Sequence, residues 1–222
     1  QMIHDVALQN LPVMFAVDRA GLVGNDGETH QGIFDLSYLS SIPNLTIMAP
    51  KNKWELSDML KFAIAADYPV AIRYPRGDAC DLWKEMRAPI VQGRAEVLCE
   101  GTDVALFAIG TMVETAWKVK EQLAEREITA TVVNARFMAP LDEKAILSAA
   151  EKYPLIVTME ENVVSGGFGE HIAALLKEHE AKVKVLPVAI ENRFVEHGDV
   201  ETLRRVLGID EKTITDRICE EL

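Results

Sequence analysis

Apolar residues along the chain follow a pattern that predicts alternating strands and helices. Short apolar runs, typical of buried strands, occur at residues 13–17, 45–49, 70–73, 104–109, 130–134, 155–159 and 183–188. Segments suited to helices lie between and after them, at residues 1–11, 34–40, 53–66, 113–125, 142–152, 168–178 and 199–208. Such alternation indicates mainly parallel sheets layered with helices, and therefore an α/β protein.

An irregular segment divides this pattern into two parts. Residues 78–89 combine mixed charges with Trp83 and Pro89, and they show neither a helical nor a strand period. We therefore predict two layered α/β domains, residues 1–89 including this linker and residues 90–222. The second domain is expected to open with a hairpin of residues 93–98 and 104–109, whose second strand is continuously apolar and hence central in its sheet.

A polar, glycine-rich loop follows the first predicted strand at residues 18–32. Its glycines, at positions 21, 24, 27 and 32, favour turns with positive φ or a close backbone approach to a ligand. Ligands of parallel sheets bind beyond the carboxyl ends of the strands, which is where this loop lies. A plain surface connection is the alternative, because the glycine spacing fits neither of the common phosphate-binding motifs.

Four side chains are candidates for chemistry. Arg19 and Arg76 each follow a predicted strand, and a guanidinium group offers a planar fork of donors that matches a phosphate. His30 is suited to proton transfer near neutral pH, and Asp26 on the same loop could orient its ring or bind a substrate hydroxyl. The residues alone leave other roles open: Arg76 and Asp26 could be turn residues, and His30 a structural hydrogen-bonding residue. Arg19 could simply pair with Asp18 or Asp26.

Other polar residues are weaker candidates. His171 and His179 lie on one predicted helix and are expected to be surface or packing residues rather than metal ligands. Glu160 and Glu161 are adjacent on an extended segment, so their side chains should point to opposite faces and not form a carboxylate pair. A turn or interface role is expected for His197, and no metal site is predicted in this chain.

Composition narrows the classes of partner. The net charge of −12 argues against nucleic acid and against an anionic membrane surface. Local arginines would have to hold a small anionic substrate against this overall negative charge. The three cysteines are widely spaced without a metal or disulfide pattern, which indicates reduced thiols in a cytoplasmic protein. No apolar run approaches the roughly 18 residues of a membrane-spanning helix.

Several sequence blocks closely resemble the thiamine-diphosphate-dependent transketolase family, in order along nearly the whole chain. The matching blocks are residues 18–39, Ile42-Pro43-Asn44, Met48-Ala49-Pro50, Arg73-Tyr74-Pro75-Arg76-Gly77, Asn134-Ala135-Arg136-Phe137, Pro140-Leu141-Asp142, Glu160-Glu161-Asn162, Gly166-Gly167-Phe168-Gly169 and Phe194-Val195-Glu196-His197-Gly198. The first block and Tyr-Pro-Arg-Gly are specific to the branch that condenses pyruvate with glyceraldehyde 3-phosphate. Met138-Ala139 departs from the family, which usually has a lysine beside the proline, and we assign that position no role.

The resemblance implies both an architecture and a reaction. Residues 1–89 would be the C-terminal part of a pyrimidine-binding domain with its linker, and residues 90–222 a transketolase C-terminal domain. The implied enzyme is a transferase that uses thiamine diphosphate and magnesium to condense pyruvate with glyceraldehyde 3-phosphate, for isoprenoid and thiamine precursor synthesis. Arg19 and Arg76 would hold the phosphate of the acceptor, while His30 and Asp26 would face its aldehyde. A cytoplasmic homodimer is also implied.

The parts of this family that hold the cofactor are not found in the sequence. Both the Gly-Asp-Gly…Asn motif for magnesium and diphosphate and the glutamate that activates the aminopyrimidine are missing, so the cofactor-binding residues of this chain are unknown. We therefore expect a C-terminal piece of a longer polypeptide, inactive alone, whose missing N-terminal domain supplies the magnesium–diphosphate site. Alternatives are another transketolase-like enzyme, such as a 2-oxoacid dehydrogenase β subunit, and a non-catalytic dimerisation module.

Overall fold

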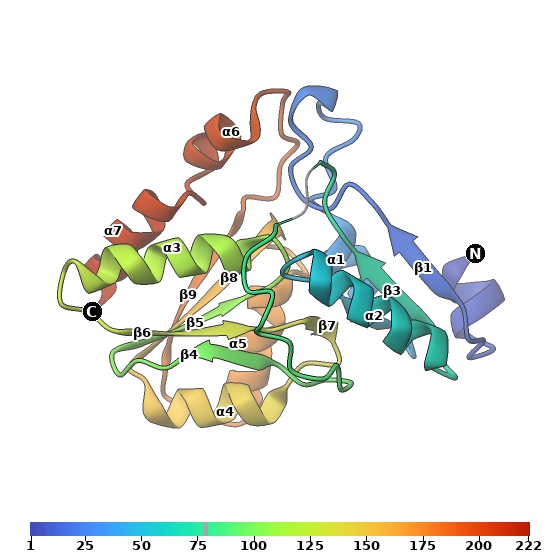
Figure 1. Cartoon of the computed structure of the whole chain (residues 1–222), viewed down its shortest axis with the longest axis horizontal. Helices are drawn as coiled ribbons and strands as arrows, with labels where there is room; N and C mark the ends of the chain where they lie inside the picture. Colours follow the sequence, from blue (N-terminus) through green and yellow to red (C-terminus); the bar gives the residue numbers. More distant parts are fainter. Residues whose placement is uncertain (78–79) are drawn as a thin grey trace.

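Two sheets form the framework of the computed structural model, which describes residues 1–77 and 80–222 (Figure 1). The first sheet has the order β1-β3-β2-β7 and consists of β1 (Met14–Val17), β2 (Thr46–Met48), β3 (Val70–Arg73) and β7 (Phe137–Ala139). Its first three strands are parallel, and β7 runs antiparallel to β2.

The second sheet has the order β4-β6-β5-β8-β9. Its strands are β4 (Glu96–Cys99), β5 (Val104–Ala108), β6 (Ala130–Asn134), β8 (Leu155–Val163) and β9 (Lys184–Ile190). All pairings are parallel except that of the edge strand β4 with β6. The central strand β5 is buried along its whole length, as its continuously apolar sequence predicts.

Helices cover both faces of the second sheet (Figure 1). The helical segments of the described residues are a π-helical turn η1 (Met2–Ala7), a 3₁₀ turn η2 (Gly24–Asp26), α1 (Asp35–Ser40), α2 (Lys53–Ala65), α3 (Met112–Ala124), α4 (Glu143–Lys152), α5 (Phe168–Glu178), α6 (Val200–Leu207) and α7 (Glu211–Glu221). One face packs against α3 and α7, and the other against α4 and α5. Because the apolar core on the second face also includes Leu36 and Ile47, it joins the two sheets.

The structure confirms the α/β class with mainly parallel sheets and corrects three details. Residues 93–98 and 104–109 do not form a hairpin, because β6 lies between β4 and β5. Gly101 packs against the backbone at Ala130, which allows the connecting segment to cross the start of β6. The sequence pattern also missed β7, which is short, and α7, because it predicted no helix after residues 199–208.

The boundary near residue 90 remains a prediction. Positions 78 and 79, at the start of the predicted linker, lie outside the described residues. Strand β7 comes from the C-terminal side of that boundary, yet it pairs with β2 in the first sheet, where Ile47 faces Ala139.

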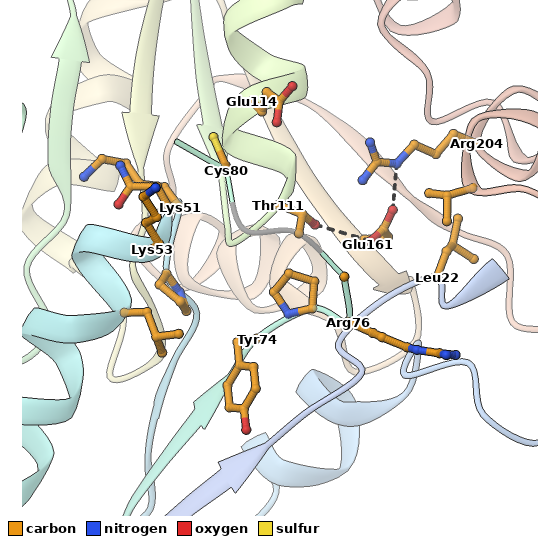
Figure 2. A pocket seen from close by; sticks show the side chains of 16 residues that line it. Leu22, Lys51, Lys53, Tyr74, Arg76, Cys80, Thr111, Glu114, Glu161 and Arg204 are labelled. Atoms are coloured by element: carbon orange, nitrogen blue, oxygen red, sulfur yellow. Dashed lines mark hydrogen bonds and ion pairs between the residues drawn. The ribbon is translucent and has the colours of Figure 1, made fainter. Parts of the chain in front are cut away.

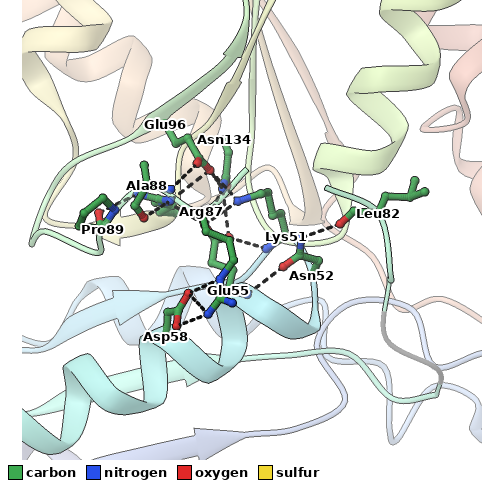
Figure 3. Close-up of polar contacts among 11 residues, drawn as sticks. Lys51, Asn52, Glu55, Asp58, Leu82, Arg87, Ala88, Pro89, Glu96 and Asn134 are labelled. Carbon is green, nitrogen blue, oxygen red and sulfur yellow. Dashed lines mark hydrogen bonds and ion pairs between the residues drawn. The ribbon is translucent and has the colours of Figure 1, made fainter. Parts of the chain in front are cut away.

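A buried ionic network connects the two sheets (Figure 3). The Lys51 ammonium lies 3.1 Å from a Glu55 carboxylate oxygen and 2.6 Å from one of Glu96. Arg136 reaches the same two carboxylates, with nitrogen–oxygen distances of 2.7 Å to Glu55 and 3.1 Å to Glu96. Asn134 donates to Glu55 as well. Two cations therefore balance two carboxylates, which is the condition for burying such charges without a large loss of stability.

Candidate functional site

The loop of residues 18–32 lies at the carboxyl edge of the first sheet. Strands β1 and β3 are paired with Val17 opposite Arg73, so the segments that follow them are neighbours. The Ala20 amide donates to the Tyr74 carbonyl at 3.0 Å, which joins these two segments directly. Mutual hydrogen bonds of 2.8 Å between Gly21 and Gly32 close the base of the loop. This is the position that the strand order predicts for a ligand site.

Three of the four predicted site residues come together in this loop. The Arg76 guanidinium donates from Nη1 to Oδ2 of Asp26, and Arg19 Nε lies 3.8 Å from the same oxygen. Arg19 also donates to Asp18 at 2.6 Å. The hydrogen bond from Arg76, followed by the charges of His30 and Arg19, lowers the pKa of Asp26. Asp26 is therefore ionised at neutral pH and lies between two guanidinium groups.

His30 lies near this cluster without a hydrogen bond to it among the described residues. Its side chain is exposed, and Nδ1 is 2.9 Å from the Thr29 hydroxyl. It is nevertheless close enough for its charge to contribute to the lowered pKa of Asp26. The imidazole is thus free to meet a group from solution.

A pocket of about 400 Å³ opens between the two sheets beside the loop, with Arg76 at its edge (Figure 2). This volume is within the usual range of small-molecule sites, which is about 300–1,000 Å³. Its wall also includes Leu22, Lys51, Tyr74, Cys80, Thr111, Glu161 and Arg204. Arg19, Asp26 and His30 do not line it, so the loop cluster and the pocket are adjacent but separate features.

Sequence reasoning missed Glu161 and Arg204 in this pocket. Arg204 Nε donates to Glu161 at 2.8 Å, and the Thr111 hydroxyl donates to the same carboxylate at 3.3 Å. The Glu161 carboxylate also lies against Gly21, where a Cβ atom would collide with it. A signal for Glu161 was available, because charged residues at the carboxyl end of a central parallel strand border the ligand-binding crevice.

Glu160 points to the opposite face of β8, as expected for an adjacent residue in a strand. Its carboxylate accepts the amide hydrogens of Phe168 and Gly169, both at 2.8 Å, at the start of α5. Burial raises the pKa of Glu160 to about 7, against the opposing effect of these two hydrogen bonds. The glycine-rich turn before α5 therefore surrounds this carboxylate.

The other histidines have local contacts. Nδ1 of His171 and of His179 each lies within hydrogen-bonding distance of the carbonyl oxygen four residues earlier. His197 is next to Gly27 of the loop. Within residues 1–77 and 80–222, no three or more histidine, cysteine or acidic side chains are grouped so as to hold a metal ion. In the same part of the chain, no helix combines the length and apolar character needed to cross a membrane.

Comparison with protein families finds two family models that match the chain. Residues 93–214 match the transketolase C-terminal domain, and residues 1–80 match the transketolase pyrimidine binding domain. The first match alone covers more than half of the chain.

Curated relatives with similar sequences bear one name. The chain is 50% identical to the 1-deoxy-D-xylulose-5-phosphate synthase of Lachnoclostridium phytofermentans over 222 residues, which is 100% of this chain and 36% of the relative. It is 52% identical to 1-deoxy-D-xylulose-5-phosphate synthase 1 of Geobacter sulfurreducens over 95% of this chain and 33% of that relative. The chain thus spans about a third of the length of these relatives.

A solved structure has the same arrangement of elements. A chain described as a split gene transketolase, inactive beta4 tetramer, superposes with a TM-score of 0.88 at 27% identity, covering 99% of this chain and 70% of that one. A transketolase from Pichia stipitis, at 19% identity and a TM-score of 0.70, shares the fold.

Proposed function

Because this chain belongs to the transketolase family, we propose that it is the part of a 1-deoxy-D-xylulose-5-phosphate synthase that receives the acceptor aldehyde. The complete enzyme condenses pyruvate with glyceraldehyde 3-phosphate, with loss of carbon dioxide, to supply isoprenoid and thiamine precursors. The observation that carries this proposal is the convergence of Arg19 and Arg76 on Asp26. Identity of 43–52% to proteins of that name over nearly the whole chain supports it.

Arg19 and Arg76 bind the phosphate of the acceptor in this proposal. The Arg19 side chain is 42% exposed and bonds Asp18 through Nη1, which leaves part of its donor fork for a phosphate. Arg76 is about half exposed and bonds Asp26 through Nη1 alone, which leaves part of its donor fork for a phosphate.

Asp26 and His30 act on the carbon skeleton of the acceptor. The ionised Asp26 accepts a hydrogen bond from an acceptor hydroxyl, and its position between two arginines orients that hydroxyl relative to the phosphate. His30, exposed beside it, donates a proton to the aldehyde oxygen as the new carbon–carbon bond forms.

We propose that magnesium and the diphosphate are held outside this chain. Among the residues that the structure describes, no suitable group of metal ligands occurs. We assign thiamine diphosphate and magnesium to the N-terminal domain of the same enzyme, where the cofactor supplies the decarboxylation chemistry. On this assignment the present chain alone is inactive. The proposed enzyme is a cytoplasmic homodimer, and the three free thiols are compatible with that compartment.

Replacing Arg76 tests the proposal in the full-length enzyme. We expect Arg76→Ala to raise the KM for glyceraldehyde 3-phosphate by about tenfold or more, because a charge-assisted contact with the phosphate is lost. The KM for pyruvate should stay the same. Steady-state kinetics with each substrate varied in turn provides the measurement.

Arg87→Ala is the matched control, because Arg87 forms an exposed ion pair with Asp58 on α2. It should change neither constant. An unchanged KM in Arg76→Ala would remove Arg76 from the acceptor site and favour a dimerisation role for this part of the enzyme. If the wild-type enzyme failed to condense the two substrates, the proposed reaction itself would be rejected.

A further inference from the structure

The loop that carries Asp26 rests on the second half of the chain. The Gly198 amide donates to the Gly24 carbonyl at 3.3 Å, and a Cβ atom on Gly24 would approach the Gly198 carbonyl oxygen to 3.0 Å. Gly27 lies next to the side chain of His197. The short 3₁₀ helix Gly24–Asp26 is therefore seated on residues 194–198, which precede α6.

One side chain joins the loop to this segment. Gln31 is buried, with 7% of its surface exposed. Its Oε1 accepts the Val23 amide hydrogen at 2.7 Å, and its Nε2 donates to the Glu196 carbonyl at 3.2 Å. The side-chain amide of Gln31, near the end of the loop, thus connects it both to Val23, earlier in the loop, and to residues 194–198.

The two parts of the acceptor cluster are anchored differently. Arg76 follows β3 and is held to the first sheet through Tyr74, whose amide donates to the carbonyl of Val17 in β1 at 3.0 Å. Asp26 belongs to the 3₁₀ turn, whose preceding residue Val23 is held by Gln31. Contact between Asp26 and Arg76 therefore depends on the loop keeping its place on residues 194–198.

We propose that Gln31 is a positioning residue, which holds Asp26 against Arg76 by fastening the acceptor loop to residues 194–198. This inference rests on the proposed function, because it concerns the binding of the same acceptor. It gives the C-terminal half of the chain a part in acceptor binding that is carried by backbone contacts. No residue of that half needs to touch the acceptor.

The test compares two variants in the full-length enzyme. Gln31→Met keeps the length of the side chain and removes both hydrogen bonds. Gln31→Glu keeps an acceptor for the Val23 amide but cannot donate to Glu196. We expect Gln31→Met to raise the KM for glyceraldehyde 3-phosphate by about tenfold, since displacing a binding group by on the order of 1 Å is costly. Gln31→Glu, which sets a buried carboxylate oxygen against the Glu196 carbonyl, should also raise this KM, and neither variant should change the KM for pyruvate.

Hydrogen exchange gives a second readout that requires no substrate. Amides of residues 22–27 should exchange at least about tenfold faster in Gln31→Met, because the loop opens more often from the segment that protects it. Gln92→Met is the matched control. Gln92 donates its side-chain amide to the Thr46 hydroxyl at 2.8 Å, away from the loop. It should alter neither the exchange of residues 22–27 nor the KM for the acceptor.

Combining Gln31→Met with Arg76→Ala completes the design. If Gln31 acts by holding Asp26 against Arg76, its effect on acceptor KM should be smaller once Arg76 is absent. Unchanged loop exchange, an unchanged acceptor KM or full additivity would each overturn the role of Gln31 while leaving the reaction intact. Absence of condensation by the wild type would instead overturn the proposed function, and the acceptor role of Gln31 with it.

Discussion

Glu160 and Glu161 are neighbours in the sequence and have opposite surroundings. The Glu161 carboxylate meets Arg204 and Thr111 at the pocket, whereas the Glu160 carboxylate meets two backbone amides at the start of α5. A strand turns successive side chains to opposite faces, and that rule alone separates them. Glu160 is buried and has no cation among its hydrogen-bond partners in the described part of the chain. Burial raises its pKa to about 7, so its ionisation changes near neutral pH.

Stability should therefore depend on pH through Glu160. Its pKa is raised to about 7 in the folded protein from the ordinary value of 4.5, so between these values the folded state holds a proton that the unfolded state has released. The contribution of Glu160 to stability falls as pH rises from about 4.5 to 7, by on the order of 1–3 kcal/mol. Urea unfolding of the wild type and of Glu160→Gln should be measured across this pH range. The difference between their free energies of unfolding should change by this amount from the lower to the higher pH.

Glu170→Gln serves as the control for this experiment. Glu170 accepts the Gly166 amide hydrogen in the same turn, at 2.7 Å, but its side chain is exposed. Because the charge of Glu170 is the weakest of the effects on the pKa of Glu160, replacing Glu170 should leave most of the pH dependence of unfolding in place. Parallel curves for wild type and Glu160→Gln would show that Glu160 does not titrate in this range.

The sequence predicted some contacts of single residues and missed others. Pairing of Arg19 with Asp26 was foreseeable because both lie on one short loop. The contact of Arg204 with Glu161 was not, because it joins a helix to a strand distant in the chain. The roles of Arg19, Asp26, His30 and Arg76 toward a substrate remain predictions.

At the scale of elements, aspartates define the starts of several helices. Asp142, Asp199 and Asp210 each accept an amide hydrogen three residues later, at the starts of α4, α6 and α7. Asp142 does more than this, because it also accepts the Ala95 amide hydrogen at 2.9 Å and so ties α4 to the segment before β4.

The two kinds of cap should differ in strength. Asp142→Ala loses the helix cap and leaves the Ala95 amide without its partner, which we expect to lower the free energy of unfolding by about 2–3 kcal/mol. Asp199→Ala loses only an exposed cap and should cost clearly less. Urea unfolding of both variants provides the comparison. Equal losses would indicate that the bond to Ala95 contributes little.

Local signals explain which elements were predicted well. The bounds of β3, β6 and α5 agree with the apolar runs and helical period, because turns or caps flank each of them. Pairing of β4 was wrong, since an edge strand's partner depends on where the chain crosses rather than on its own alternation. Only Ile214, Thr215 and Ile218 of α7 are buried, and so sparse an apolar face gives a weak helical signal.

At the scale of the whole molecule, buried charges hold the two sheets together. Lys51 and Glu55 precede the predicted boundary near residue 90, and Glu96, Asn134 and Arg136 follow it. The four-residue spacing could suggest the Lys51–Glu55 pair, but nothing local predicts that Arg136 joins it. The ionic network and the shared apolar core together hold one sheet in a fixed position relative to the other.

Removing one member of this network should be strongly destabilising. Lys51→Met leaves two buried carboxylates with a single cation, and we expect the free energy of unfolding to fall by about 3–5 kcal/mol. Lys53→Met, two residues along, removes only an exposed pair with Asp81 and should leave stability nearly unchanged. Urea unfolding measures both. Similar effects of the two substitutions would mean that the buried network does not hold the sheets together.

The position of β7 also has a consequence for how the protein is made on the ribosome. Because Phe137–Ala139 pairs with β2, the first sheet lacks this edge strand until the chain has been synthesised past residue 139. During that interval β2 keeps unpaired backbone groups along one side, which are a template for another nascent chain. The first sheet can therefore be completed only after β7 has been synthesised, so the folding of the first sheet depends on a later part of the chain.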